Sequence, residues 1–337
     1  MIKKIFHQTK PHKIKLIAAL STIPLLLICV GLLNFSNDAP NQNESYKNQF
    51  NKDYRIFAVN IPDKIDFAGE RIPIEDFDIR ERLDRELLVN TYWQSQTLLW
   101  IKRSNRWLPI ISGILKKNNV PDDFKYLALI ESGFTNAISS KGASGFWQFI
   151  EPTAKSYGLE INDEVDERYN PEKSTEAACK YFKESYKQFN SWTMVAASFN
   201  MGLNGLFKQT EKQKSGNYYD LALNDETSRY IFRIAAAKEI ISRPADYGFL
   251  VRNKDLYPAI PFTSLKVDSS ITDMVQFSQN QGINYKLLKI LNPWLRSDKL
   301  TNPNKKSYFI KIPKGDIKNY NWLLEADEEI QKKDSLN

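Results

Sequence analysis

The chain of 337 residues has 42% hydrophobic, 26% charged and 12% aromatic positions, which excludes a disordered protein, a collagen-like fibre and a disulfide-stapled miniprotein. A net charge of +7 can indicate a protein that binds nucleic acid. Residues 1–15, however, hold five lysines and no acidic residue, so the rest of the chain has 42 basic and 40 acidic residues. A body so close to neutral has no field to attract a polyanion, so we expect no nucleic-acid binding.

An apolar segment of eighteen residues, 16–33, follows the basic flank 1–15. A run of about 20 apolar residues spans a bilayer, whereas the apolar part of a cleaved signal peptide has about 7–15 residues. The polar residues after Leu33 make a poor cleavage site, and Ile28 before Cys29 does not suit lipoprotein processing. Lysines on the amino side place that end in the cytoplasm. We therefore expect an uncleaved signal anchor that exports the rest of the chain, with a cleaved signal or a buried core helix as alternatives.

Two short regions lead from this segment to the main body. Residues 34–52 are rich in Asn, Gln, Ser and Asp and predict a flexible linker. Residues 53–76 alternate short apolar pieces with proline and charge, which is typical of an extended arm that includes a strand.

The chain has two cysteines, Cys29 and Cys179, and their different surroundings favour two small apolar residues over a disulfide.

The region 77–250 predicts a mainly α domain, because apolar residues recur at helical spacing and no strand pattern appears between 77 and 245. Pro109 and Pro121 each suit the first turn of a helix, and Asn170 before Pro171 predicts an N-cap followed by the first helical residue. Further helices are predicted at 153–157, 192–201 and 227–241. The buried stripe of the helix that starts at Pro171 is predicted to contain Ala177, Ala178, Tyr181, Phe182, Ser185 and Phe189.

After Pro244 the pattern changes to strand, helix, helix, strand. Strands are predicted at 262–267 and 308–312, and short helices at 271–279 and 285–291, with Ser270 and Asn284 as N-caps. We therefore expect a small α+β module over 262–313. Residues 314–337 are expected to form a helix that ends in a polar tail.

The segment 121–134 places an acid where the helical pattern is otherwise apolar. Phe124, Leu127 and Ala128 mark one helical face, and Glu131 is the next position on it. Burial would raise the pKa of this carboxyl towards neutrality, which suits a general acid. The alternative is a frayed helix end at which Glu131 reaches solvent, and this segment by itself leaves both interpretations open.

Three further segments each have a plain structural explanation when they are taken alone, and the first of them also suits a sugar. Two glycines precede Trp147 and Gln148, an aromatic and amide pair that suits a sugar but also suits a glycine turn beside a core tryptophan. Asn200 ends a helix of small residues, which alone indicates a C-cap. Tyr230 lies on an apolar helical face, where core tyrosines are common.

Together and in this order, the four segments resemble the catalytic domain of the soluble-type lytic transglycosylases, relatives of goose-type lysozyme. That family's pattern runs Glu-Ser, Gly-Leu-Met-Gln, Ala-Tyr-Asn-x-Gly and a downstream tyrosine. The matching residues are Glu131-Ser132, Gly145-Phe146-Trp147-Gln148, Ser198-Phe199-Asn200-Met201-Gly202 and Tyr230. The resemblance covers about residues 77–250 and implies a mainly α, lysozyme-like fold.

The flanking regions resemble the membrane-bound, D-type branch of this family, whose members usually carry LysM modules after the catalytic domain. Residues 262–313 have the order of elements of such a module, and we expect it to be LysM-like. Two departures stand out. Asp268-Ser269-Ser270 replaces the usual Gly-Asp-Thr, and Ser198-Phe199 stands where the family favours Ala and Tyr.

The resemblance implies a peptidoglycan lyase of the cell envelope, anchored in the inner membrane with its body in the periplasm and without a cofactor. Glu131 would act as acid and then as base in cleaving the MurNAc-GlcNAc β-1,4 bond, leaving a 1,6-anhydro-MurNAc end. Ser132 would help to orient Glu131, Gln148 and Asn200 would hold polar groups of the glycan, and Tyr230 would donate a hydrogen bond near the carboxylate. The sequence makes no prediction of the oligomeric state.

Two other functions fit the same residues. A muramidase that uses water needs a second acid near the cleft, and the acidic run Asp163, Glu164, Asp166 and Glu167 is the candidate, although a solvated loop is the simpler interpretation. A wall-binding protein without activity is the other, and an intact Glu131-Ser132 pair argues against it. Both histidines lie in the first fifteen residues, so we expect no His/Cys metal site in the exported part.

Overall fold

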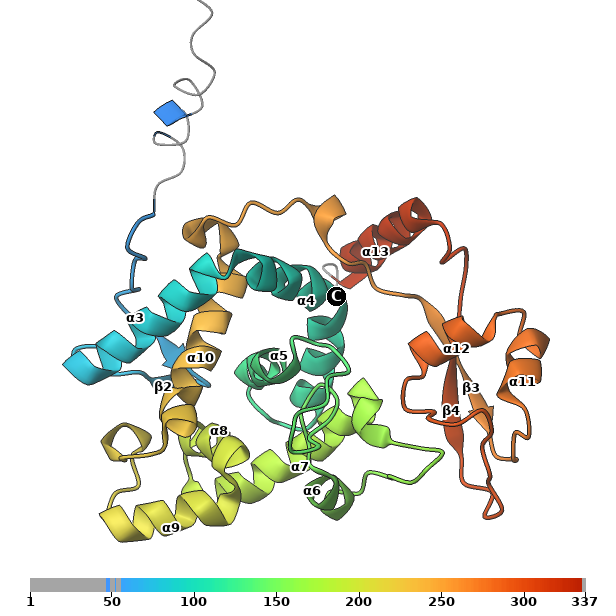
Figure 1. Cartoon of the computed structure of the whole chain (residues 1–337), viewed down its shortest axis with the longest axis horizontal. Helices are drawn as coiled ribbons and strands as arrows, with labels where there is room; N and C mark the ends of the chain where they lie inside the picture. Colours follow the sequence, from blue (N-terminus) through green and yellow to red (C-terminus); the bar gives the residue numbers. More distant parts are fainter. Residues whose placement is uncertain (1–46, 49–51, 53–55, 335–337) are drawn as a thin grey trace, which may run out of the picture. The chain divides into compact units, whose positions relative to one another are not determined.

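Residues 47–48, 52 and 56–334 are described by the computed structural model shown in Figure 1. Two units divide the chain, Met1–Ala58 and Val59–Asn337, and everything below concerns the second. The predicted basic flank, the signal anchor at 16–33 and most of the linker lie outside the described residues. Among the residues that are described, no helix is long and apolar enough to cross a bilayer.

Helices make up most of the region 77–250, as predicted. Every residue from 77 to 245 is described, and none of them lies in a strand. Helix α9 was not among the predicted elements. The helices are α3 (Phe77–Tyr92), α4 (Gln94–Lys117), α5 (Lys125–Ser132), α6 (Glu151–Ser156), α7 (Pro171–Phe189), α8 (Trp192–Met201), α9 (Leu203–Gln213) and α10 (Asp225–Ser242).

Local capping explains where α7 begins, as the sequence predicts. The side chain of Asn170 accepts a hydrogen bond from the backbone N–H of Lys173 at 3.0 Å, and Pro171 occupies the first turn. The predicted stripe faces inward, and Ala177 and Phe182 are fully buried within it. The prediction for this helix is therefore confirmed.

The prediction that Pro109 starts a helix is wrong, because Pro109 lies inside α4. Trp100 and Ile101 before it and Ile111 after it are all buried in the same core. Packing on both sides therefore holds one helix through a proline that is itself exposed. Pro109 has no N–H to donate to the helix, and because this position is exposed, water can reach the side of α4 where that hydrogen bond is missing.

The arm before α3 forms a small hairpin that belongs to the core. Strands β1 (Asp66–Phe67) and β2 (Glu70–Arg71) pair antiparallel across a tight turn. Phe67 is fully buried, and its ring lies 5.1 Å from that of Phe124 just before α5. The apolar residues of the arm therefore pack into the core of the helical domain.

Helix α10 is the central element of this domain and contacts α3, α5 and α8 (Figure 1). Its buried residues fall on more than one face, as expected for a helix covered on several sides. Cys179 lies in the same core on α7, where burial raises the pKa of its thiol to about 12. It behaves as the small apolar residue that the sequence predicts.

The second part of the unit has the predicted order of strand, helix, helix and strand. It contains β3 (Phe262–Val267), α11 (Met274–Asn280), α12 (Tyr285–Leu291) and β4 (Tyr308–Pro313), with β3 and β4 antiparallel, and α13 (Tyr320–Asp334) follows. Asn284 caps α12 as predicted, but Ser270 does not cap α11. Asp273 does so instead, because Ile271 is held in an extended bridge to Leu300 and the helix begins only after it.

Both apolar and polar contacts join this small module to the helical domain. Val165 pairs with Leu295 in an isolated bridge, and both are buried in a second core together with Trp294. Glu160 accepts hydrogen bonds from the hydroxyl of Tyr308 at 3.0 Å and is paired with Lys306. The acidic run 163–167 therefore lies at this junction.

Candidate active site

Helix α5 presents Glu131 at its carboxyl end. Gly133 ends the helix in the left-handed region, at a φ of +57°, and its N–H donates to the carbonyl of Leu129 at 2.8 Å. Apart from Lys125, the residues of α5 before Glu131 are buried, and the Glu131 side chain is half-buried. The acid therefore stands where a buried helix reaches the surface.

Tyr230 of α10 donates a hydrogen bond from its hydroxyl to Oε1 of Glu131. Burial raises the pKa of Glu131, against the hydrogen bond from Tyr230 and the positive charge of Arg233, and the negative charge of Glu226 raises it further. Burial and the neighbouring Glu131 also raise the pKa of Tyr230 well above its ordinary value. The pair thus consists of a carboxyl that retains its proton more readily and a phenol that stays a neutral donor.

Ser132 ties the end of α5 to the glycine-rich loop 141–149. Its hydroxyl oxygen lies 2.9 Å from the carbonyl oxygen of Phe146 and 3.2 Å from that of Ala128, and it accepts from the N–H of Phe134. The side chain therefore binds main-chain groups on both sides of Glu131 and fixes the loop against the helix.

Close backbone packing shapes the loop itself. Gly145 has a φ of +76°, and a Cβ at this position would lie 1.9 Å from the carbonyl oxygen of Arg168. Arg168 in turn donates to the carbonyls of Gly142 and Phe149, which brackets the loop. Only glycine fits at position 145, because both the backbone angle and the space exclude a side chain.

Gln148 and Asn200 are held by hydrogen bonds to their surroundings. Gln148 donates from its amide nitrogen to the carbonyls of Ala137 and Gly145, at 3.0 and 2.8 Å. Asn200, at the end of α8, accepts from Thr227 at 2.7 Å and donates to Glu226 at 2.9 Å. Both amides are therefore fixed in orientation before any ligand binds.

Two hollows meet at Glu131 and together form what we call the cleft. The first has a volume of about 570 Å³ and is bordered by α3, α4 and the end of α5, with the exposed Trp93 on its wall. The second has a volume of about 480 Å³ and contains Gln148 and Asn200. Glu131 and Glu226 line both hollows, so the acid lies between two binding spaces.

The structure brings four of the five predicted site residues to the surface of the cleft, and the fifth, Tyr230, reaches Glu131 from the core. Trp147 is fully buried and donates to Thr175 at 2.8 Å, so it is a core residue. The acidic run 163–167 does not line the cleft, and its nomination as a second acid there is wrong. It lies at the junction with the module, where the backbone N–H of Arg296 donates to the carbonyl of Glu164.

Sequence reasoning missed Glu226, which lines both hollows as Glu131 does, whereas Glu86 and Asp225 line only the first. Glu226 lies on α10, four residues before Tyr230, and residues four apart share one face of a helix. That spacing is the signal that points to it. Within the described part of the chain, no group of three His, Cys, Asp or Glu side chains is arranged to hold a metal ion.

Family comparison agrees with this geometry. Residues 109–221 match the family described as the transglycosylase SLT domain. The chain carries an SLT domain. Residues 263–316 match the soluble lytic transglycosylase C-terminal LysM-like domain, which confirms the LysM-like module. Glu131, Ser132, Gln148 and Asn200 fall inside the SLT match, whereas Tyr230 follows its end.

Individual relatives extend the likeness beyond the SLT domain. Membrane-bound lytic murein transglycosylase D of Escherichia coli, in strains K12 and O6:H1, is 29% identical over 243 residues, which are 69% of this chain and 52% of the relative. A protein of Alteromonas sp. strain M-1, named for tributyltin chloride resistance, is 26% identical over 171 residues, 48% of this chain and 78% of that protein. The chain thus spans about half the length of the E. coli relatives.

Proposed function

We propose that this chain is a peptidoglycan lytic transglycosylase that cleaves the MurNAc-GlcNAc β-1,4 bond and leaves 1,6-anhydro-MurNAc ends. The observation that carries the proposal is the carboxyl of Glu131, raised in pKa by burial and hydrogen-bonded by Tyr230 where the two hollows meet. The SLT match at residues 109–221 supports the same activity.

In the first step Glu131 donates its proton to the glycosidic oxygen. Its raised pKa favours the protonated form before the reaction, and general acid catalysis of this kind contributes about 10²–10⁴-fold. The bond between the anomeric carbon and that oxygen breaks, and positive charge develops on the MurNAc ring. The N-acetyl group of the same sugar stabilises this charge.

In the second step the Glu131 carboxylate removes the proton from the C6 hydroxyl of the same MurNAc. The hydroxyl oxygen attacks the anomeric carbon and closes the anhydro ring, so no water is consumed. The Tyr230 hydroxyl and the charge of Arg233 stabilise the carboxylate between the two steps. An attack within one sugar gains a large effective concentration, which is why one carboxylate is enough.

The remaining cleft residues act on the glycan or position the acid. Gln148 and Asn200 line the second hollow in fixed orientations and hold polar groups of the sugars there. Ser132 acts on Glu131 indirectly, since its hydroxyl binds the main chain around it. The LysM-like match at residues 263–316 supports a second contact with the wall polymer.

We also propose that the chain resides in the cell envelope, anchored by the apolar segment 16–33 in the inner membrane with its body in the periplasm. The lysines before this segment and its length of eighteen residues support the proposal. The E. coli relatives are named as membrane-bound.

A muramidase that uses water is the second candidate, and Glu226 is the observation that favours it. This exposed carboxylate lines both hollows beside Glu131 and could activate a water on the opposite face of the sugar. Its hydrogen bond to Asn200 argues for a structural task instead.

Mass spectrometry of the products from purified peptidoglycan tests the proposal. Anhydro ends, one water lighter than reducing ends, are expected from the wild type, and Glu131→Gln is expected to abolish them while the fold survives. Glu226→Gln is the matched variant, and it should leave the anhydro product unchanged in kind. Reducing ends that disappear in Glu226→Gln would instead establish the muramidase. A wall that binds the protein but is never cut would establish a non-catalytic binding protein.

A further inference from the structure

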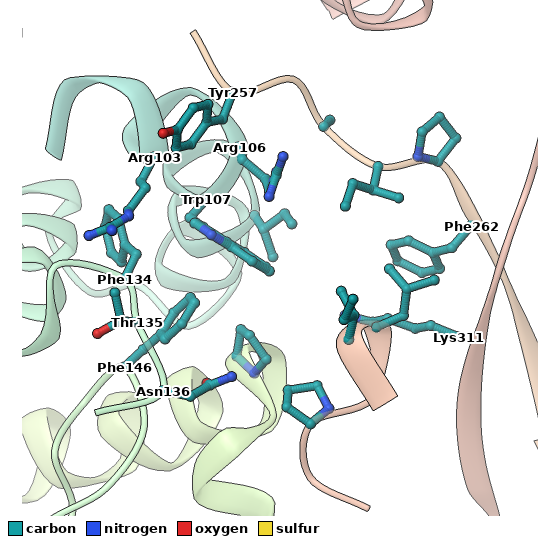
Figure 2. Close-up of a pocket in the computed structure, with 18 of the residues that line it drawn as sticks. Arg103, Arg106, Trp107, Phe134, Thr135, Asn136, Phe146, Tyr257, Phe262 and Lys311 are labelled. Carbon is teal, nitrogen blue, oxygen red and sulfur yellow. The ribbon is translucent and has the colours of Figure 1, made fainter. Parts of the chain in front are cut away.

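A third hollow lies outside the cleft, between the SLT domain and the LysM-like module (Figure 2). Its volume is about 460 Å³, a size typical of ligand sites. Trp107 and Phe146, which pack edge to face at 4.9 Å between ring centres, form one wall. Phe262 and Ile290 of the module form the opposite wall. The interior is therefore mainly apolar.

Three basic side chains border this apolar interior, and one of them, Lys311, is already paired with Glu172. Arg103, Arg106 and Lys311 line the hollow, and no acidic residue is among the described residues that line it. Figure 2 shows Arg106 and Lys311 extending from facing sides of the space. The charge therefore favours an anionic ligand, and the apolar walls favour one that also carries alkyl groups.

Each cation is held by partners within the protein. Arg106 donates from Nε to the carbonyl of Pro258 at 2.8 Å, Arg103 donates to the carbonyl of Gly133 at 3.1 Å, and Lys311 is paired with Glu172. A guanidinium has five N–H donors, so Arg106 retains donors for a carboxylate. Burial lowers the pKa of Arg106 against the negative charge of Asp327, and a bound anion would compensate further for the solvation that this cation has lost.

One stretch of chain, 133–137, borders both this hollow and the cleft. Gly133 and Ala137 line the first hollow of the cleft, whereas Phe134, Thr135 and Asn136 line the third hollow. A substituent on a sugar bound beside Glu131 would therefore reach the third hollow by passing around this stretch. The hydroxyl of Thr135 and the amide of Asn136 offer polar partners for peptide groups there.

We propose that the third hollow binds a short acidic peptide with aliphatic side chains, the class to which the peptide branches of peptidoglycan belong. The choice of this peptide rests on the proposed function, whereas the preference for an apolar anion rests on the hollow alone. The hollow would then let the protein distinguish glycan strands that carry peptides from strands that do not.

Calorimetry with the full chain tests the binding step. The probe is a synthetic peptide of alanine, γ-linked glutamate, diaminopimelate and alanine, and the comparison is the same peptide with its carboxyl groups amidated, which removes every negative charge. We expect the amidated peptide to bind at least tenfold more weakly, and Arg106→Gln to weaken the acidic peptide by a similar factor. Ile290→Glu, which adds a negative charge at an exposed position of the same hollow, should act likewise. Lys116→Gln removes an exposed charge elsewhere on α4 and should change nothing.

Cleavage rates separate this inference from the proposed function. The two variants at the hollow should lower the rate on peptide-bearing strands at least fivefold relative to the rate on strands stripped of peptide. Equal loss on both substrates, equal binding of the amidated peptide, or binding of anionic phospholipid vesicles in place of the peptide would overturn the inference. Expected peptide binding in a chain that cuts neither substrate would refute the proposed function and leave the hollow assigned.

Discussion

The hydroxyl of Tyr230 donates a hydrogen bond to Oε1 of Glu131, although 99 positions of sequence separate the two residues. Tyr230 is fully buried on the central helix α10, so its position is set by the core, and the hydrogen bond transfers that rigidity to the acid. One oxygen of the carboxyl is therefore fixed by the protein, and the other is left to carry the proton.

Tyr230→Phe should lower the cleavage rate about 10–100-fold, because a hydrogen bond to a charged group contributes about 1.5–3 kcal/mol. The hydrogen bond lowers the pKa of Glu131, so its loss should raise that pKa. A protonated acid is needed for the first step, and the alkaline limb of the pH–rate profile should therefore move to higher pH. Initial rates on purified peptidoglycan between pH 4 and 9 check this. An unchanged limb with a lowered rate would reduce Tyr230 to a packing residue.

Glu131→Gln should be more heat-stable than the wild type at alkaline pH. Burial raises the pKa of Glu131 in the folded state above its ordinary value of 4.5. The stability that the protonated acid contributes is therefore complete below about pH 4.5 and is lost as the pH rises through the folded-state pKa. Glutamine does not ionise and avoids this loss. The difference in Tm should grow from pH 4 to pH 8 by a few degrees, since about 1 kcal/mol corresponds to about 2–4 °C. A difference independent of pH would contradict the assigned burial.

Two glycines of the glycine-rich loop 141–149 form a matched pair for mutation. Gly142 and Gly145 share a φ of +76°, but only at Gly145 would a Cβ meet the carbonyl oxygen of Arg168. Gly142→Ala should cost about 1–2 kcal/mol of stability from the backbone angle alone. Gly145→Ala should cost about 2–5 kcal/mol, because the clash is added. Urea unfolding measures both, and equal losses would mean that the loop gives way without resistance.

Glu160→Gln should loosen the LysM-like module from the SLT domain. Although burial acts to raise it, the pKa of Glu160 is lowered overall by Lys306 and the hydroxyl of Tyr308. The contribution of Glu160 is therefore present above pH 4.5, its ordinary pKa, and is lost as the pH falls through the lowered value. Loss of this contact should weaken the junction by about 1 kcal/mol and speed proteolysis near the exposed Leu250 about fivefold at pH 7. Glu211→Gln on exposed α9 is the control and should leave the proteolysis rate unchanged.

Much of this architecture can be predicted because it depends on local chemistry. Glu131 stands out as an acid on an apolar stripe and becomes the candidate acid only together with the three motifs that follow it, whereas Asn-Pro by itself marks the start of α7. The predictions from Ser270 and Pro109 are wrong because contacts with residues distant in the sequence determine where those two helices begin. Because Ile271 forms a bridge with Leu300, α11 begins only after it, and packing against the core keeps α4 helical on both sides of Pro109.

The junction and the position of Glu226 could not be predicted in the same way. The pairing of Val165 with Leu295 joins segments that are 130 positions apart, and no spacing in the sequence predicts this pairing. Glu226 was detectable in principle from its spacing to Tyr230, but its place beside Glu131 depends on how α5 packs against α10.

The burial of Cys179 bears on where such a protein can work. Attack on a disulfide requires a thiolate, and a thiol whose pKa is raised to about 12 is almost never ionised at neutral pH. Burial also keeps oxidants and other proteins away from the sulfur. In an oxidising compartment the folded helical domain would therefore keep Cys179 reduced.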